Sequence, residues 1–428
     1  FSSQAACVRT GHYRGTFMQP KYLLALASAL LSSTAAFAAQ TPIQFNLIDT
    51  GGVGPGTQAA LGFQAAANYW SSVLTTSQPI TININVGYAP LGPGILGSTG
   101  SSRSIQAAIN VKNRIVARQS SSLDTSLMMP TFHDGAYGAG TALNMYTPGY
   151  TGVDVNGDPY GIDNATKVYD TDGQYNATFI AVNVANARAL GYTFAPTQID
   201  ASITFSSDFG WDFNPRNGIS AGRYDFQAVA IHEIGHALGF VSGVDDYDYL
   251  GTGGPAADAD CGGFACKDYP AQGDWWGTTL DLFRYSAADT LDWTTNTPSY
   301  FSADGGASAY QNGNFSTGSF NGDGWQASHW KAPQLPSGPL SCALPKLGIE
   351  NPYICRGRVG IVTGLDLAAY DAIGYNTDED LFTYAMSTAD IAYASTHVPE
   401  PAAWAMMIGG FGMIGGALRR RRTGFATA

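Results

Sequence analysis

The spacing of apolar residues predicts a strand, a helix and a second strand at the start of the folded region. The run IQFNLI, residues 43–48, and the alternating run ITININVGY, residues 80–88, have the pattern of strands. Between them, residues 59–74 place apolar side chains such as Phe63 and Trp70 at helical spacing. We therefore expect the domain to open in strand, helix, strand order.

A long region rich in Gly, Ser and Asn follows, from residue 91 to residue 176. Its patterns are weaker, and we expect one short helix within it, at residues 104–117. Beyond it, the runs FIAVNVANARAL (179–190) and ASITFSS (201–207) have the apolar content of helix or strand pieces. The second run is a natural edge of a cleft, along which an extended peptide can lie as an added strand.

Residues 225–239 have the sequence of a complete helix. Asp225 can cap the first turn, and Gly239 can end the helix in a left-handed turn. Four apolar positions give the helix a buried side: Val229, Ile231, Ile234 and Leu238.

This helix contains the run HEIGHALGF, in which His232 and His236 are four residues apart. That spacing places two imidazoles on one helix face, close enough to bind one metal ion, while Glu233 projects beside them. Zinc held in this way activates a water molecule, and the glutamate acts as the general base that takes its proton. The chain has only four Glu and six His, so chance placement of one Glu between two His would be rare. The run predicts a zinc hydrolase rather than a structural histidine pair.

A catalytic zinc normally has three protein ligands and one open position, so a third ligand is needed. The compact pattern HExxHxxGxxH fails here, because its last position is Ser242. A downstream Glu would be the ligand in a thermolysin-like site, and Glu350 is the candidate. Among the histidines, His133 and His329 are candidates, and His329 in the run ASHW is the better one.

Several motifs together resemble the leishmanolysin branch of the metzincins: HEIGHALGF, the distant His-Trp pair, the turn GIENP (348–352) and the run IVTGLDLAAYDAIGY (361–375). The resemblance implies that His329, 93 residues beyond His236 (329 − 236), is the third zinc ligand. The family has a Met in the turn beneath the zinc, and Ile349 stands in the matching segment. The implied fold is α+β, a two-lobed metzincin-like protease whose loop-rich C-terminal lobe carries His329.

Both ends of the chain have the pattern of targeting segments. Residues 18–39 have a Lys, an apolar stretch and an A-x-A site, as a secretory signal peptide does, and we expect residues 1–17 to be an upstream extension. Residues 398–422 contain Pro-Glu-Pro, an apolar run and four Arg, and they resemble the PEP-CTERM sorting signal. This resemblance implies an exosortase partner and delivery to the cell surface, the alternative being a plain membrane anchor. Residues 40–390 are then the catalytic domain.

The net charge argues against two classes of partner, and the cysteines indicate an oxidising compartment. The net charge of −12 argues against a nucleic acid or an anionic membrane as the partner, since both attract clustered Lys and Arg. Four cysteines lie outside the upstream extension, and three pairings are open to them. Proximity in sequence favours Cys261 with Cys266 and Cys342 with Cys355. The spacings are not C-x-x-C, and export favours disulfides over a cysteine zinc site.

Two acidic loops are candidate sites for calcium as a second cofactor. DVNGD (154–158) and DTDG (170–173) place oxygen ligands at alternate positions, but neither completes a calcium loop, and solvated turns are the favoured interpretation. A further cluster just after the predicted helix is interpreted as a polar loop rather than as zinc ligands: Asp245, Asp246 and Asp248.

We therefore predict an exported zinc endopeptidase that acts on proteins or peptides, with Glu233 as its general base. Two other functions are open to the same sequence. One is a zinc hydrolase of a non-protein substrate, and the other is a surface or matrix protein that keeps the fold without turnover. An intact Glu233 speaks against the second.

Overall fold

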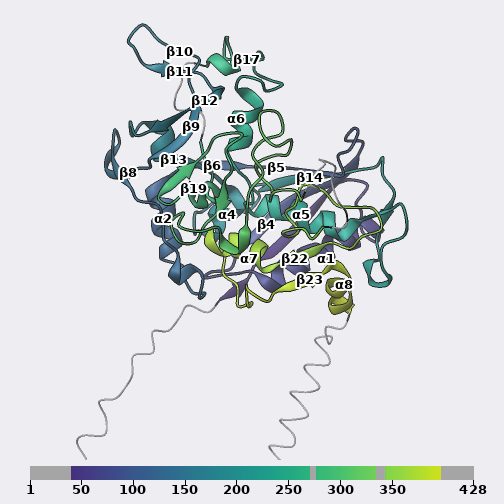
Figure 1. Ribbon diagram of the computed structural model, residues 1–428. Helices are drawn as coiled ribbons and strands as arrows, with labels where there is room; N and C mark the ends of the chain where they lie inside the picture. Colours follow the sequence, from purple (N-terminus) through teal and green to yellow (C-terminus); the bar gives the residue numbers. More distant parts are fainter. Residues whose placement is uncertain (1–39, 270–275, 334–341, 343, 397–428) are drawn as a thin grey trace, which may run out of the picture. The chain divides into compact units, whose positions relative to one another are not determined.

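The computed structural model describes residues 40–269, 276–333, 342 and 344–396 (Figure 1). The predicted upstream extension, signal peptide and sorting segment lie outside these residues. Within the described ranges, every helix is too short or too polar to cross a membrane. The apolar run predicted to enter the membrane, 402–418, is not among the residues searched.

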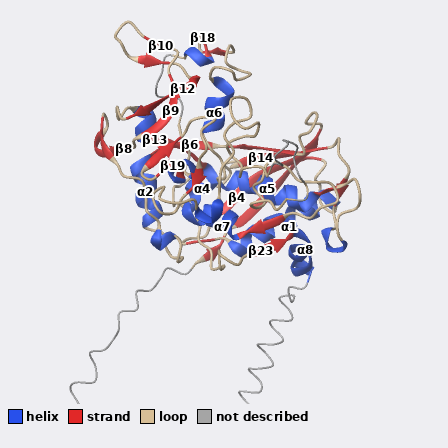
Figure 2. Ribbon diagram, viewed as in Figure 1, coloured by secondary structure: helices blue, strands red, loops and turns tan. Residues whose placement is uncertain are grey.

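The main sheet has four strands in the order β2 (Gln44–Gly51), β4 (Thr81–Ala89), β14 (Ala201–Ser206) and β5 (Gly97–Ser101). The first three strands are parallel, and β5 runs antiparallel to β14. The predicted strands at 43–48 and 80–88 are confirmed within one or two residues. The described chain is thus a mixed α/β structure with small sheets (Figure 2).

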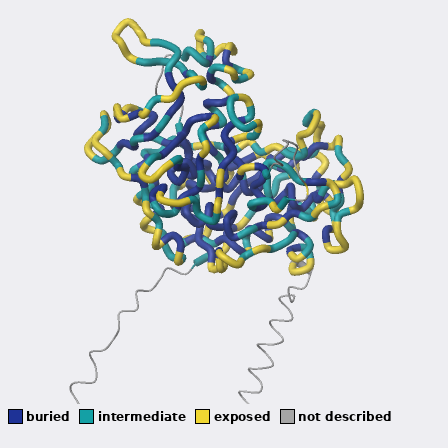
Figure 3. The backbone as a smooth tube through the Cα atoms, viewed as in Figure 1, coloured by how far each residue is buried: buried dark blue, intermediate teal, exposed yellow. Residues whose placement is uncertain are grey.

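Two helices pack against each other and against this sheet: α1 (Gln58–Val73), which confirms the predicted helix, and α5 (Phe226–Leu238). The Trp70 indole of α1 donates to the Ile231 carbonyl of α5 over 3.0 Å, so the partner helices are fixed in register. Both residues are fully buried, and each such side chain contributes about 1.5–3 kcal/mol of hydrophobic stabilisation. The same buried core runs through α5 in Figure 3.

The predicted helix at 104–117 is wrong in its first turn. Residues Arg103–Ala107 form β6, which pairs antiparallel with β13 (Phe179–Asn183), and α2 (Ala108–Val116) begins only after that strand. The pairing joins segments more than 70 residues apart, so the local pattern of apolar residues does not record it. The run at 179–190 correspondingly divides into β13 and a short helix, α4 (Val184–Ala189).

The prediction that residues 201–207 form a cleft edge is also wrong. They form β14, which is flanked by β4 on one side and by β5 on the other. The edge strands of this sheet are β2 and β5, and β5 lies in the Gly- and Ser-rich run in which the sequence predicts no strand. Any peptide that adds a strand to the sheet at this end would therefore pair with β5.

A second sheet contains residues from both halves of the chain. Its strand order is β12 (Asp163–Asp170), β9 (Met145–Gly149), β20 (Thr290–Asp292), β19 (Arg284–Ala287) and β21 (Tyr300–Phe301). Only the β9–β20 pairing is parallel.

The other described elements are short. The remaining α-helices are α3 (Tyr175–Thr178), α6 (Val244–Leu250), α7 (Gly364–Ala372) and α8 (Thr388–Thr396). Single turns of 3-10 helix occur at Asp124–Ser126, Pro215–Asn217, Cys266–Asp268, Leu280–Phe283 and Tyr310–Asn312. Two-stranded sheets pair β1 (Thr41–Pro42) with β3 (Thr75–Thr76), β7 (His133–Gly135) with β8 (Gly138–Ala142), β10 (Gly152–Val153) with β11 (Pro159–Tyr160), β15 (Trp211–Asp212) with β16 (Tyr224–Asp225), β17 (Asp260–Cys261) with β18 (Phe264–Ala265), and β22 (Ile361–Thr363) with β23 (Ala385–Ser387).

Both predicted disulfides are present, Cys261–Cys266 and Cys342–Cys355. The first closes the β17–β18 hairpin, and the second ties residue 342 to the segment that follows the GIENP turn. Cross-links of this kind persist in oxidising compartments, in agreement with an exported protein.

The Asp225 carboxylate joins α5 to the C-terminal part of the domain. It is fully buried, and it accepts hydrogen bonds from the Ala228 N–H at 3.1 Å, the Gly360 N–H at 3.1 Å and the Thr388 hydroxyl. It therefore caps α5, as predicted, and also anchors the segments before β22 and at the start of α8.

We expect Asp225→Ala to lower the free energy of unfolding by about 2–4 kcal/mol. Loss of a cap costs about 0.5–2 kcal/mol, and each buried donor left unpaired costs about 1–3 kcal/mol. Urea unfolding followed by tryptophan fluorescence measures the change. Asp208→Ala, at an exposed aspartate, is the matched control. Equal stability of the two variants would contradict the anchoring role.

Candidate metal centre

Helix α5 presents its two histidines from an otherwise buried surface. Every other residue of the helix is buried, whereas His232 and His236 are partly exposed. The helix ends at Gly239, whose φ of 126° is the left-handed conformation expected of a glycine that terminates a helix. A four-residue separation inside a helix then places both imidazoles on the same face.

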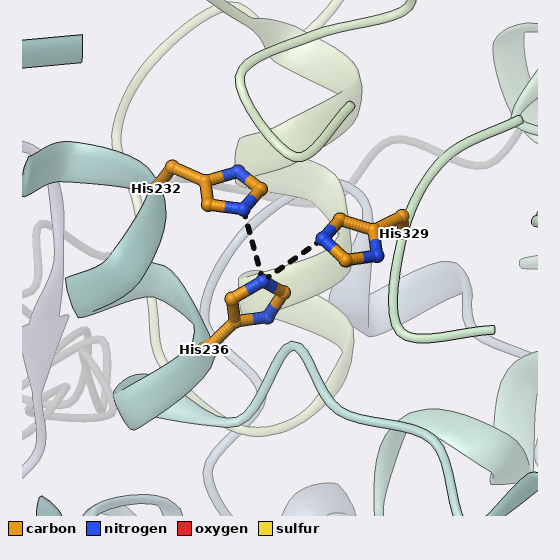
Figure 4. Close-up of side chains that lie close together, drawn as sticks. All are labelled: His232, His236 and His329. Atoms are coloured by element: carbon orange, nitrogen blue, oxygen red, sulfur yellow. Dashed lines mark hydrogen bonds between the residues drawn. The ribbon is translucent and has the colours of Figure 1, made fainter. Parts of the chain in front are cut away.

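His329 approaches these two side chains from a loop, and Figure 4 shows the three rings facing one another. The Nε2 atom of His236 lies 3.1 Å from Nε2 of His232 and 3.2 Å from Nε2 of His329. In the part of the chain that the structure describes, this is the one group of three or more His, Cys, Asp or Glu side chains arranged to hold a metal ion. The structure therefore brings together the three histidines that the sequence singled out.

A backbone carbonyl orients each ring. The Nδ1 atoms of His232 and His236 lie 2.9 Å from the Ile349 carbonyl and 2.7 Å from the Phe240 carbonyl, and Nδ1 of His329 lies 3.2 Å from the Gln326 carbonyl. A carbonyl only accepts, so Nδ1 carries the proton and Nε2 keeps its lone pair. This is the tautomer that a metal-binding imidazole needs.

Burial also keeps the three rings neutral. It lowers the pKa of His232 to about 3 and that of His236 to about 4, and it lowers the pKa of His329 well below its usual range. Each lone pair is thus free for a cation at neutral pH. Nitrogens that share a tetrahedral zinc at about 2.0–2.1 Å lie roughly 3.3 Å apart, so the observed separations and the all-imidazole donor set fit zinc.

Glu233 follows His232 in α5, and its carboxyl contacts strand β5. Its Oε2 atom is 2.6 Å from the Thr99 hydroxyl, which is also 2.9 Å from the Glu233 carbonyl oxygen. A Cβ at Gly97 would lie only 2.5 Å from Oε1, so β5 approaches the carboxyl closely because residue 97 is glycine. Burial raises the pKa of Glu233 to about 7, within the range of a general base at neutral pH.

Two aspartates, the half-buried Asp245 and the buried Asp366, hold the loop that carries His329. Asp245 accepts from the Ala327 N–H at 2.6 Å, from the Ser328 N–H at 3.1 Å and from the Ser328 hydroxyl. On the other side, the Trp330 indole donates to Asp366 over 2.8 Å. His329 is therefore fixed through both of its chain neighbours, and its side chain is only 7% exposed.

The segment 349–350 lies beneath α5, with a different arrangement from the one the family resemblance implied. Ile349 contributes its backbone carbonyl to His232, while the Glu350 carboxyl lies behind the same ring, with Oε2 3.4 Å from Nδ1. Glu350 is thus on the side of His232 opposite Nε2 and does not join the cluster of donor atoms, so the thermolysin-like alternative is wrong. Burial raises the pKa of Glu350 well above its usual range.

The other candidate residues lie outside the cluster. His133 is exposed on strand β7. Asp248 accepts from the Phe320 and Asn321 N–H groups, and Asp246 forms an ion pair with Arg103. The prediction of a polar loop at 245–248 is wrong, because these aspartates lie in helix α6, and they are not part of the histidine cluster.

The loops considered for calcium use their carboxylates for their own backbone. Asp154 accepts from the N–H groups of Asn156 and Asp158 at 2.8 and 2.9 Å. Asp170 accepts from the Asp172 N–H at 3.2 Å, and Asp172 accepts from the Gln174 N–H at 2.8 Å. Both are the hydrogen-bonding patterns of Asx turns.

Sequence analysis missed Thr99, Gly97 and Asp366, which position Glu233 and Trp330. The first two lie in a stretch without apolar alternation, so only the strand pairing reveals them. Of the three, only Asp366 stands in a local sequence pattern that could have identified it. It is the third residue of α7 after Thr363, and this Thr-x-x-Asp spacing forms a capping box in which Asp366 also accepts from the Ile349 N–H at 2.9 Å.

Comparison with known families gives two matches. The model for the matrixin family, which is a metzincin zinc protease family, matches residues 177–245, and the model for the PEP-CTERM protein-sorting motif matches residues 397–422. No curated protein and no solved structure matches the chain. The first match runs from the end of α3 through α5 and stops before His329, and it agrees with the predicted metzincin class, although it names matrixins rather than the leishmanolysin branch. The second confirms the predicted sorting motif, which indicates export to the cell envelope or surface.

Proposed function

We propose that this protein is an exported zinc-dependent endopeptidase in which His232, His236 and His329 hold the metal. The observation that carries the proposal is the convergence of three Nε2 atoms, with 3.1 and 3.2 Å between neighbours, beside the buried carboxyl of Glu233. The matrixin match supports zinc protease chemistry and covers the first two histidines and the glutamate. Residues 40–390 form the catalytic domain, with the two-lobed organisation of a metzincin.

Zinc in this site supplies Lewis acidity, which makes a water molecule acidic near neutral pH and polarises the scissile carbonyl. Glu233 is the general base: it takes the proton from the attacking water and passes it to the leaving amine. The Thr99 hydroxyl, 2.6 Å from Oε2, fixes the orientation of the Glu233 side chain during both transfers. The three backbone carbonyls that receive the Nδ1 protons keep the imidazoles in place.

The substrate is an extended stretch of protein that pairs with β5. In the described part of the sheet, β5 is the last strand, and no described strand pairs with its other side. A peptide added there would run past Gly97 and Thr99, the residues that touch Glu233. The scissile bond would then lie next to the base, while backbone hydrogen bonds bind the chain with little regard to its sequence.

The test is hydrolysis of an unfolded protein, such as casein, by the purified protein. We expect cleavage within the chain, loss of cleavage when a chelator removes zinc, and recovery when zinc is returned. Mass spectrometry of the products distinguishes internal cleavage from trimming of the ends. If a zinc-loaded, folded protein leaves every unfolded substrate intact, the endopeptidase assignment fails, and a zinc hydrolase of another substrate or a protein without turnover takes its place.

A further inference from the structure

Arg284 is a fully buried arginine in strand β19 of the second sheet, and the reaction outlined above gives it no role. A buried charge is unfavourable unless hydrogen bonds and neighbouring groups compensate for its lost hydration. None of the ion pairs among the described residues includes Arg284, so direct contact with a carboxylate does not explain its presence. Its hydrogen bonds show what it holds.

The two terminal nitrogens of the guanidinium bind two backbone carbonyls. Nη1 donates to the Ala327 carbonyl at 3.3 Å, and Nη2 donates to the Ser316 carbonyl at 2.8 Å. The guanidinium carbon also lies 4.8 Å from the centre of the Phe315 ring, a distance at which a cation and an aromatic face attract each other. Both carbonyls belong to one segment, residues 315–330, which we call the His329 loop.

The two carbonyls lie on opposite arms of the His329 loop. The arms pair with each other, because Phe315 forms an antiparallel bridge with Trp330 and the two rings stack with centroids 5.0 Å apart. In the same pairing, the Ser316 N–H donates to the His329 carbonyl at 2.9 Å. Ser316 therefore links Arg284 to the backbone of His329, since its carbonyl accepts from the arginine and its N–H donates to the histidine.

The backbone two residues before His329 is held from two sides. Arg284 donates to the Ala327 carbonyl, while Asp245 accepts from the Ala327 N–H at 2.6 Å. The two side chains come from different elements, β19 and α6. Because the guanidinium presents its donors in one rigid plane, it can hold both arms of the loop at a fixed separation, which the single nitrogen of a lysine cannot do.

We propose that Arg284 is a positioning residue for the metal centre, which acts through the backbone of the His329 loop. His232 and His236 are placed by one helix, but His329 reaches them from a loop 93 residues beyond His236 (329 − 236). Fixing both arms of this loop before the metal arrives reduces the conformational freedom that binding would otherwise remove, and thus favours zinc binding. The inference rests on the proposed function only in taking His329 as a ligand.

The test is zinc affinity, measured by competition with chromophoric chelators of graded affinity. Arg284→Lys keeps the positive charge and removes the two-point contact, so it separates the effect of geometry from that of charge. We expect zinc affinity to fall by about 10-fold, the lower end of the range for groups that act on a metal through its ligands. Arg358→Lys makes the same change at an exposed position and is expected to bind zinc like wild type.

A double-mutant cycle distinguishes positioning of His329 from a general loss of structure. In a His329→Ala background, the ligand that Arg284 positions is gone, so Arg284→Lys is expected to cause no further loss of zinc affinity. Leu291→Ala removes buried apolar volume from β20, which pairs with β19, and leaves the arginine in place. This variant controls for destabilisation of the sheet, and while folded it is expected to keep the zinc affinity of wild type.

Unchanged zinc affinity in folded Arg284→Lys would overturn the inference. So would an equal loss in the wild-type and His329→Ala backgrounds, or an equal loss in Leu291→Ala. If Arg284→Lys does not fold, Phe315→Leu removes the ring against which the guanidinium packs and replaces it in the same cycle, with a smaller loss expected.

Failure of this inference differs from failure of the proposed function. A wild-type protein that binds zinc and cleaves protein keeps its function even if Arg284 has no effect on zinc affinity. A wild-type protein that binds no zinc overturns both.

Discussion

Glu233→Gln is expected to reduce protein hydrolysis by about 10²- to 10⁴-fold, the contribution typical of a general base, while zinc binding stays unchanged. The amide cannot accept the proton of the attacking water, but it has the size of the carboxyl and fits the space left by Gly97. The Thr99 hydroxyl can still donate to the amide oxygen, so the side chain is expected to keep its orientation. Initial rates with casein, measured beside zinc content, check the prediction.

Glu379→Gln is the matched control for this substitution, since it removes one exposed carboxylate elsewhere in the domain. Its rate is expected to equal that of wild type. A Glu233→Gln variant that retains more than about one tenth of the wild-type rate would fall outside the range for a general base and would assign proton transfer to another group. Because both proteins carry the same net charge, a general electrostatic effect cannot account for a difference between them.

How much of the site the sequence predicts depends on how local its determinants are. The ends of α5, its N-cap and the positions of His232, Glu233 and His236 follow from fifteen consecutive residues, because capping and i, i+4 geometry operate within one helix. The strand β5 was missed for the opposite reason. Its sequence, GSTGS, has no apolar alternation, and it becomes a strand only by pairing with β14 about 100 residues later.

The residues that hold the His329 loop in place could not be predicted from the sequence either. Asp245 holds the Ala327–Ser328 backbone from more than 80 residues away, and Asp366 holds Trp330 from 36 residues away. Neither carboxylate differs in sequence from an ordinary loop or cap aspartate. The family resemblance therefore identified His329 as the third ligand. The structure supports this choice over His133, because His329 Nε2 lies 3.2 Å from His236 Nε2 whereas His133 is exposed.

His329→Ala is expected to weaken zinc binding by more than the 10- to 100-fold typical of outer-shell changes, and to abolish hydrolysis. Two imidazoles remain 3.1 Å apart on α5, but they leave the metal with two solvent-filled positions instead of one. The loop itself should persist, since Asp245 binds the backbone and hydroxyl of residues 327–328 and Asp366 binds the neighbouring indole. Circular dichroism tests that persistence, and chelator competition measures the affinity.

The comparison with His133→Ala makes this result specific to position 329. His133 is exposed on β7 and outside the cluster, so its removal is expected to change neither zinc affinity nor rate. If His329→Ala bound zinc as tightly as wild type, the metal would be held by another set of donors, and the convergence of the three Nε2 atoms would be a packing arrangement only. If instead zinc affinity falls sharply in a folded His329→Ala variant and is unchanged in His133→Ala, the third ligand is supplied by a loop, beyond the matched helical segment at 177–245.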